Sequence, residues 1–149
     1  MVYMGAGCAY HAYWSDQVRV FAVGRATDHQ RRMYAVMHEA FDRCFAMLRP
    51  GVPVSDVMRT SLAVLEAGGA GRYAGRLGRI GHGTGLDLSE PPSINLDDGS
   101  VLEAGMVLFL EPNFVTPEGN FQVEDTVLVT EDGAELLSSR APAELPVIA

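Results

Sequence analysis

The sequence predicts an α+β fold in which helices pack on one face of a curved antiparallel sheet. Three observations predict it: a β-rich stretch up to residue 24, two helical patterns between residues 27 and 67, and strand-like runs after residue 107. Helices and strands that occur in separate runs are typical of α+β proteins. At 149 residues the chain is expected to form a single domain, 1–149, with a core of its own.

The first 24 residues favour two strands. Tyr10–Trp14 and Val18–Val23 are rich in aromatic and β-branched side chains, which fit a pleated surface. Asp16 lies between these two runs, so we expect it in the loop or bulge that joins the strands. An aspartate in such a place commonly accepts backbone hydrogen bonds as a turn residue.

Two helices are expected next. Thr27 followed by Gln30 forms a capping-box pattern, and apolar side chains then recur at helical spacing over 33–48. A second amphipathic run covers 54–67 and stops at a pair of glycines. His38 occupies a polar position of the first helix, and we expect it to be solvated.

Strand-like alternation returns near the C-terminus. Val107–Val115 and Phe121–Val129 alternate, and Pro117–Asn120 is typical of the hairpin turn between them. Glu111 and Glu124 fall inside these predicted strands. A charged side chain in an apolar strand costs free energy unless another group pairs with it.

The pattern Gly81-His82-Gly83 closes a glycine-dense segment, 71–85, that we expect to be a loop. Glycines remove bulk, so an imidazole edge can approach a partner closely. One imidazole together with carboxylates such as Glu111 and Glu124 makes a ligand set that Mn, Co, Zn or Fe ions accept. Each residue alone is equally compatible with a loop histidine or a surface charge, but the three together predict a divalent metal site.

Composition excludes several classes of protein. The net charge of −8 argues against general nucleic-acid binding, and the acids are concentrated in residues 81–149, which hold 13 acids and one Arg. The most apolar run, Met106–Leu110, is too short to span a membrane. Cys8 and Cys44 give no disulfide framework, so we expect two core thiols and a cytoplasmic protein without a signal peptide.

Several motifs closely resemble the pita-bread metallohydrolases, the family of Xaa-Pro dipeptidase, aminopeptidase P, methionine aminopeptidase and creatinase. The resemblance covers nearly the whole chain in matching order and spacing, and it implies the C-terminal part of a pita-bread catalytic domain that lacks its N-terminal half. The motifs that carry it are Tyr13–Asp16, Arg19–Gly24, Leu48–Gly51, Gly81–Pro92, Leu102–Met106, Glu111-Pro112 and Val123–Thr130.

The resemblance implies five metal ligands. Four of them have matching positions in this chain, namely Asp16, His82, Glu111 and Glu124. The fifth, an aspartate eleven residues before the Asp16 position, falls on Gly5, which has no side chain to bind a cation. We therefore expect one divalent ion (Mn, Co, Zn or Fe) rather than two.

The resemblance also implies catalytic roles. Glu111 would be the general base beside the attacking water. A substrate-binding histidine that handles protons falls on Ser89, so serine holds the substrate-binding position here. A hydroxyl does not shuttle protons near neutral pH as an imidazole does.

The leading functional prediction is an Xaa-Pro dipeptidase or aminopeptidase P-like metallohydrolase that acts on a peptide or small amide substrate. One alternative is a creatinase-like non-peptide amidinohydrolase, since Gly5 removes a metal ligand. Another is a catalytically silent relative or a truncated fragment. A missing half-domain would expose a sheet edge, so we also expect a homo-oligomer.

Overall fold

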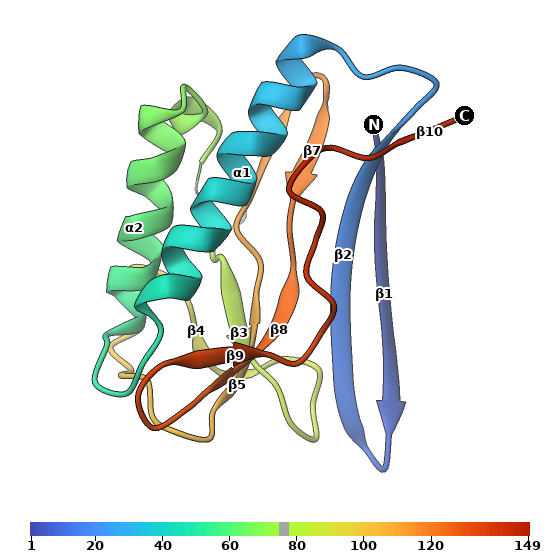
Figure 1. Cartoon of the computed structure of the whole chain (residues 1–149). Coiled ribbons are helices and arrows are strands. Elements are labelled where there is room, and N and C mark those ends of the chain that lie inside the picture. Colours follow the sequence, from blue (N-terminus) through green and yellow to red (C-terminus); the bar gives the residue numbers. More distant parts are fainter. Residues whose placement is uncertain (75–77) are drawn as a thin grey trace.

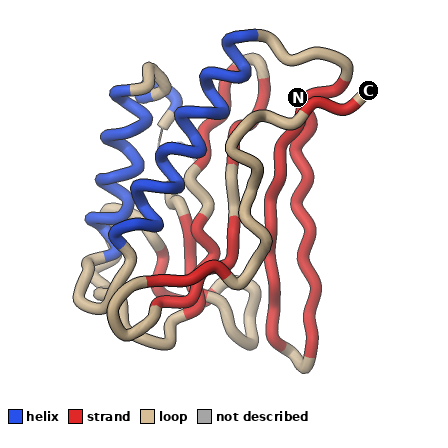
Figure 2. Tube along the Cα trace, viewed as in Figure 1, coloured by secondary structure: helices blue, strands red, loops and turns tan. Residues whose placement is uncertain are grey.

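The computed structural model describes residues 1–74 and 78–149 and has the predicted α+β class. Its two α-helices lie side by side over one face of the strands, while a long hairpin stands at the opposite end of the molecule (Figures 1 and 2). The elements in chain order are β1 (Val2–Tyr10), β2 (Tyr13–Val23), α1 (Asp28–Met47), α2 (Val54–Ala67), a 3-10 helix (Gly71–Tyr73), β3 (Gly81–Gly83), β4 (Glu90–Ser93), β5 (Val107–Leu110), β6 (Asn113–Thr116), β7 (Gly119–Gln122), β8 (Asp125–Val129), β9 (Ala134–Leu136) and β10 (Val147–Ile148).

The strands β1 and β2 pair in antiparallel register along the whole hairpin. Asp16 lies opposite Gly7 within β2, so its predicted place in the connection between two strands was wrong. The connection is the pair His11-Ala12, whose φ angles are 49° and 69°. Turns with positive φ at both positions usually contain Asn or Gly, so this turn carries no recognisable sequence signal.

The two helices follow the sequence prediction closely. The Thr27 hydroxyl accepts a hydrogen bond from the Gln30 amide at 3.1 Å, and the Gln30 side chain accepts one from the Thr27 amide at 2.9 Å. This reciprocal pair is the predicted capping box. The second helix ends at Gly68, where an added Cβ would lie 2.4 Å from Val36 Cγ1. Glycine at this point therefore lets α2 end against α1.

The strands after α2 form a five-stranded antiparallel sheet in the order β4-β3-β5-β8-β9. Residues 81–83 were expected in a loop, but they form β3 in the middle of this sheet. The loop expected over 71–85 also includes 75–77, which lie outside the described residues.

Each of the two predicted C-terminal strands is broken into two. The first run divides into β5 and β6, the second into β7 and β8, and the hairpin turn falls between β6 and β7 as predicted. Glu111 and Glu124 lie in the breaks rather than inside strands. Proline has no amide hydrogen, so Pro112 interrupts the first ladder directly after Glu111.

The two faces of the five-stranded sheet have different neighbours. Leu108, Leu110 and Val127 belong to the core that packs against the helices. Because side chains alternate along a strand, Phe109 and its partner His82 on β3 point to the face opposite Leu108 and Leu110. The His82 ring meets Phe109 edge to face, with 5.3 Å between ring centroids, so His82 lies on the face remote from the helices.

A buried ion pair joins the hairpin to this sheet beside Glu124. Asp125 has no exposed surface and accepts hydrogen bonds from Arg19, from the Ser138 hydroxyl at 2.9 Å and from the Ala141 amide at 3.2 Å. Arg19 also donates to the backbone carbonyl of Glu124. This network fixes β2 against β8 at the level of the acidic side chains.

Two expectations for single residues were wrong. His38 is only 7% exposed because the C-terminal segment covers it, with its Nε2 atom 3.4 Å from the Ala141 carbonyl oxygen. Cys44 is buried as expected, but Cys8 is exposed on β1. Periodicity places a residue on one face of an element, and it does not say which later segment covers that face.

We expect Asp125→Ala to lower the free energy of unfolding by about 3 kcal/mol, because it leaves a partly buried guanidinium and a buried amide without their acceptor. Urea denaturation measures this change. Asp132→Ala, at an exposed turn, is the control and should change the value by less than about 0.5 kcal/mol. Equal effects of the two variants would contradict the structural role of the Asp125 network.

Candidate metal centre

The glycines around His82 are required by the close packing of neighbouring strands. An added Cβ on Gly81 would lie 2.5 Å from the Phe109 carbonyl oxygen, and one on Gly83 would lie 2.3 Å from the Pro91 carbonyl oxygen. These distances are too short for any side chain. The glycines thus allow β3 to pack between β4 and β5, whereas the sequence predicted that they would permit a tight turn in a loop.

His82 is held as a neutral imidazole that donates through one ring nitrogen and keeps the other as an acceptor. It is 5% exposed, and burial is the main cause that lowers its pKa. Its Nδ1 atom donates to the Gly83 carbonyl oxygen at 2.9 Å, which leaves Nε2 as the acceptor. That Nε2 atom lies 3.8 Å from Glu111 Oε1, so His82 presents its lone pair toward the acidic side chains.

Glu111 and Glu124 share one amide donor. Gln122 Nε2 donates to Glu111 Oε2 at 3.0 Å and lies 3.4 Å from Glu124 Oε2. Burial raises the pKa of Glu111 to about 7 and that of Glu124 to about 8, and the charges of neighbouring carboxylates add to both shifts. Two acids with elevated pKa values in one place are typical of a functional site.

Asp16 completes the acidic group from the hairpin. A single bridge pairs Val18 with Glu124, and the Thr126 hydroxyl donates to the Asp16 backbone carbonyl at 3.4 Å. The charge of Asp16 raises the pKa of Glu111 and of Glu124 and supports the proton on His82. The structure therefore brings all four sequence-predicted residues into one electrostatic neighbourhood.

These side chains do not form a closed coordination shell as they stand. Within the described residues, no three His, Cys, Asp or Glu side chains converge closely enough to hold a cation together. Like charges repel, and the acids are instead turned toward Gln122 and toward Arg79, whose Nε lies 3.8 Å from Glu111 Oε1. The four residues therefore influence each other electrostatically, but their side chains are not arranged as a preformed metal-binding site.

The chemistry of the site nevertheless fits a divalent cation. Glu124 is 2% exposed, and in the part of the chain that the structure describes its Oε1 atom has no hydrogen-bond partner. A buried carboxylate oxygen without a partner carries a large desolvation cost, which a bound cation offsets. An imidazole and carboxylate oxygens are the donors that Mn, Co, Zn and Fe ions accept.

Gly5 and Ser89 are the two positions at which the resemblance implies another residue. At Gly5 an added Cβ would make only ordinary contacts, the nearest at 3.7 Å to Val18 Cγ2, so a side chain would fit there. Ser89 accepts a hydrogen bond from Arg79 Nη1 at 3.1 Å. The serine is therefore linked to Glu111 through a guanidinium group.

Sequence reasoning missed Arg79 and Gln122 as members of the site. Gln122 precedes Glu124 by two residues, and Arg79 precedes His82 by three. Neither spacing marks a motif, because the contacts arise from strand breaks that bend the chain around the acids. The one signal for Gln122 was that residues two apart in a strand share a face, so Gln122 could be expected on the same side as Glu124.

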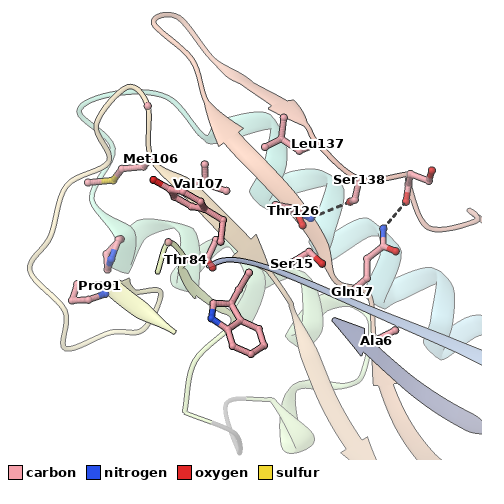
Figure 3. A pocket seen from close by; sticks show the side chains of 16 residues that line it. Ala6, Ser15, Gln17, Thr84, Pro91, Met106, Val107, Thr126, Leu137 and Ser138 are labelled. Carbon is pink, nitrogen blue, oxygen red and sulfur yellow. Dashed lines mark hydrogen bonds between the residues drawn. The ribbon is translucent and has the colours of Figure 1, made fainter. Parts of the chain in front are cut away.

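A cavity of about 800 Å³ lies at the seam between the hairpin and the five-stranded sheet (Figure 3). Thr84 and Thr126 line it, and each lies two residues beyond a candidate ligand, His82 and Glu124 respectively. The opposite wall comes from the hairpin and includes the Trp14 ring, whose indole N–H donates to the Leu86 carbonyl at 3.1 Å. None of the four candidate ligands lines this cavity.

Comparison with known families gives a match over most of the chain. The profile of metallopeptidase family M24 matches residues 1–131. The Xaa-Pro dipeptidase of Pyrococcus furiosus is 34% identical over 139 residues, which cover 93% of this chain and 39% of that protein. An uncharacterized peptidase of Bacillus subtilis, YqhT, is 31% identical over 149 residues that cover 99% of this chain and 41% of the relative.

Solved structures give the same result for the fold. The dipeptidase PepE of Mycobacterium ulcerans superposes with a TM-score of 0.90 at 32% identity, covering 97% of this chain and 39% of that one. The chain thus spans about two fifths of the length of the relatives it matches. The partial pita-bread fold expected from the motifs is confirmed.

The elevated pKa values give a pH dependence with a definite sign. Unfolded glutamate has a pKa near 4.5, while Glu111 and Glu124 have values of about 7 and about 8 when folded. A raised folded pKa means that ionisation opposes folding, so the stability contributed by the protonated forms is lost as pH rises through these values. We expect chelator-treated protein to lose roughly 2 kcal/mol or more of unfolding free energy between pH 5 and pH 8.

Urea denaturation at several pH values measures this loss. The Glu124→Gln variant keeps the shape of the side chain without its charge, so its profile should be flatter. Addition of Mn²⁺ at pH 8 should restore stability to the unsubstituted protein and less to the variant. A profile that is the same in both proteins would contradict the burial of this carboxylate.

Proposed function

The chain belongs to metallopeptidase family M24, and we propose that it carries a mononuclear divalent metal site of an Xaa-Pro peptidase type. The cation would be held by Asp16, His82, Glu111 and Glu124. The observation that carries this proposal is that, within the described residues, the buried Oε1 atom of Glu124 has no hydrogen-bond partner. Glu111 shares the Gln122 donor with it and lies 3.8 Å from His82 Nε2. Manganese, cobalt, zinc and iron all suit this donor set.

One ion per chain follows from the ligands that remain. The resemblance assigns the second ion to an aspartate at the position of Gly5, and glycine offers no donor. The residues of the first site are all present. Relatives named Xaa-Pro dipeptidase support a substrate in which the bond before a proline is cleaved, or a small amide related to it.

The residues around the site support general-base catalysis by Glu111. A bound divalent cation would supply Lewis-acid activation of the attacking water. A carboxylate beside the cation stays ionised, so Glu111 can accept a proton from the attacking water and release it later. Gln122 donates a hydrogen bond to Oε2 of this carboxylate at 3.0 Å and so fixes its orientation.

Arg79 supplies positive charge next to the proposed base. Its contact with Glu111 lowers the pKa of that carboxyl against the larger effect of burial, so the base is not held fully protonated. Ser89 orients the guanidinium by accepting its hydrogen bond. Ser89 would thus act at the substrate-binding position by holding a cation rather than by moving protons.

The proposal extends to the setting of the site. We propose that residues 1–149 are the C-terminal part of a catalytic domain, that the chain works as a homo-oligomer, and that it is cytoplasmic. The uncharged edge strand β1 and the cysteine pattern support the last two statements. Among the described residues, no helix has both the length and the apolar character needed to cross a membrane.

A creatinase-like reaction on a non-peptide amidine or amide is the second candidate. Gly5 and Ser89 favour it, because one position has lost a metal ligand and the other an imidazole. A panel that contains both an Xaa-Pro dipeptide and creatine separates the two activities. Turnover of neither substrate by a metal-loaded, folded sample would favour the silent relative.

The mononuclear proposal predicts the number of ions that bind. Isothermal titration with Mn²⁺ should give about one ion per chain. Gly5→Asp places a carboxylate on the face that carries Asp16, where the backbone has room for it, so this variant should bind close to two. Two tight sites in the unsubstituted protein, or none, would refute the proposal.

The ligand assignment predicts the effect of Asp16→Ala. Loss of a ligand should reduce Mn²⁺ affinity and Xaa-Pro dipeptide turnover by more than the roughly 10–100-fold typical of an outer-shell partner. Asp97→Ala removes an exposed acid from the same half of the sequence as His82 and should change neither quantity. Full activity of Asp16→Ala would show that the assignment of this ligand is wrong.

A further inference from the structure

Tyr3 lies on the same face of the hairpin as the acidic side chains. Directly opposite residues of an antiparallel pair point to one face, and so do residues two apart along a strand. Tyr3, Gly5 and Gly7 therefore share a face with their partners on β2, which are Val20, Val18 and Asp16. Glu124 joins this face through its bridge to Val18.

The Tyr3 ring borders the space that Gly5 leaves open. A Cβ built on Gly5 would meet two side chains only, Val18 Cγ2 at 3.7 Å and Tyr3 Cε1 at 4.0 Å. The ring edge that carries Cε1 is next to the phenolic carbon, so the hydroxyl end of Tyr3 is directed along the strand toward residue 5. An aromatic oxygen is thus close to the position where the resemblance expects a carboxylate.

The hydroxyl also lies within the field of the candidate ligands. After burial, the charges of Glu124, Glu111 and Asp16 each raise the pKa of the Tyr3 phenol. No other group is among the causes of this shift. These are the three acids that would hold a cation. Tyr3 is 46% exposed, so its side chain can reorient without displacing the core.

We propose that the phenolic oxygen of Tyr3 is a further ligand of the metal site and takes the coordination position that Gly5 cannot supply. This inference rests on the proposed function, because it requires a cation between Asp16, Glu111 and Glu124. On binding, the phenol loses its proton to solvent and the phenolate oxygen donates an electron pair to the cation. A phenolate is a hard oxygen donor, which suits Fe and Mn ions.

Ferric ion, added as its nitrilotriacetate complex, is the probe. A tyrosinate bound to iron(III) produces a charge-transfer absorption in the visible range and tyrosinate modes in the resonance Raman spectrum, whereas carboxylates and imidazole produce neither. We expect both signals in the unsubstituted protein and their loss in Tyr3→Phe. Tyr10→Phe is the matched control, since Tyr10 is on the same strand but on the opposite face, and it should keep both signals.

Affinity provides a second readout that does not depend on iron chemistry. Isothermal titration with Zn²⁺ should show a Kd that is about tenfold higher in Tyr3→Phe than in the unsubstituted protein, and unchanged in Tyr10→Phe. Circular dichroism confirms that the variants are folded, and the Raman spectrum of the unsubstituted protein tests the ligand without any substitution.

The outcomes separate this inference from the function on which it rests. Metal binding by the unsubstituted protein without tyrosinate signals, or with signals that survive in Tyr3→Phe, overturns the role of Tyr3 and leaves the four-ligand site standing. Absence of binding of both iron and zinc overturns the proposed metal site and this inference together. Signals that disappear in Tyr3→Phe alone, with weaker zinc binding, support it.

Discussion

The burial of two carboxylates next to each other is the constraint on which the rest of this structure depends. Glu111 and Glu124 lie in breaks between strands, share the amide of Gln122, and are shielded from water on a sheet whose other face is apolar. Their elevated pKa values express the free energy that this placement costs. A protein that only needed stability would replace such acids with apolar residues, so their retention points to a charged partner.

The surrounding elements hold these acids in place without neutralising them. Helices α1 and α2 cover the apolar face of the sheet (Figure 1), and His82 lies with Phe109 on the opposite face. Arg19, one of the counter-charges in this region, is engaged with Asp125 and with a backbone carbonyl. Arg79 contacts only one oxygen of Glu111, at 3.8 Å. Glu124 therefore keeps an oxygen without a hydrogen-bond partner among the described residues.

The sequence predicted the local features of this protein better than the long-range ones. The capping box at Thr27 and the second helix follow from steric and hydrogen-bonding rules within a few residues, whereas the glycines beside His82 are required by contacts with Phe109 and Pro91 that lie further along the chain. Asp16 was misplaced because an unmarked two-residue turn shifts the hairpin register. The burial of His38 was not predicted because the segment that covers it, at Ala141, lies more than a hundred residues further along the chain. The exposure of Cys8 was not predicted because the sequence did not show that β1 is the edge strand of its sheet. Arg79 entered the site through tertiary contacts that no spacing encodes.

Gly5 and Ser89, the two positions at which the resemblance implies a different residue, each have a polar side chain nearby. Tyr3 borders the space at Gly5, and Arg79 is hydrogen bonded to Ser89 while it contacts Glu111. A site that has merely decayed has no reason to keep its acids buried, since each uncompensated carboxylate weakens the fold. In this chain the acids persist, and the altered positions are flanked by a phenol and a guanidinium, groups that bind cations and anions respectively. If the proposed function holds, this is a site with a changed set of donors, so its metal content and its ligand spectrum test that function more directly than a search for substrates.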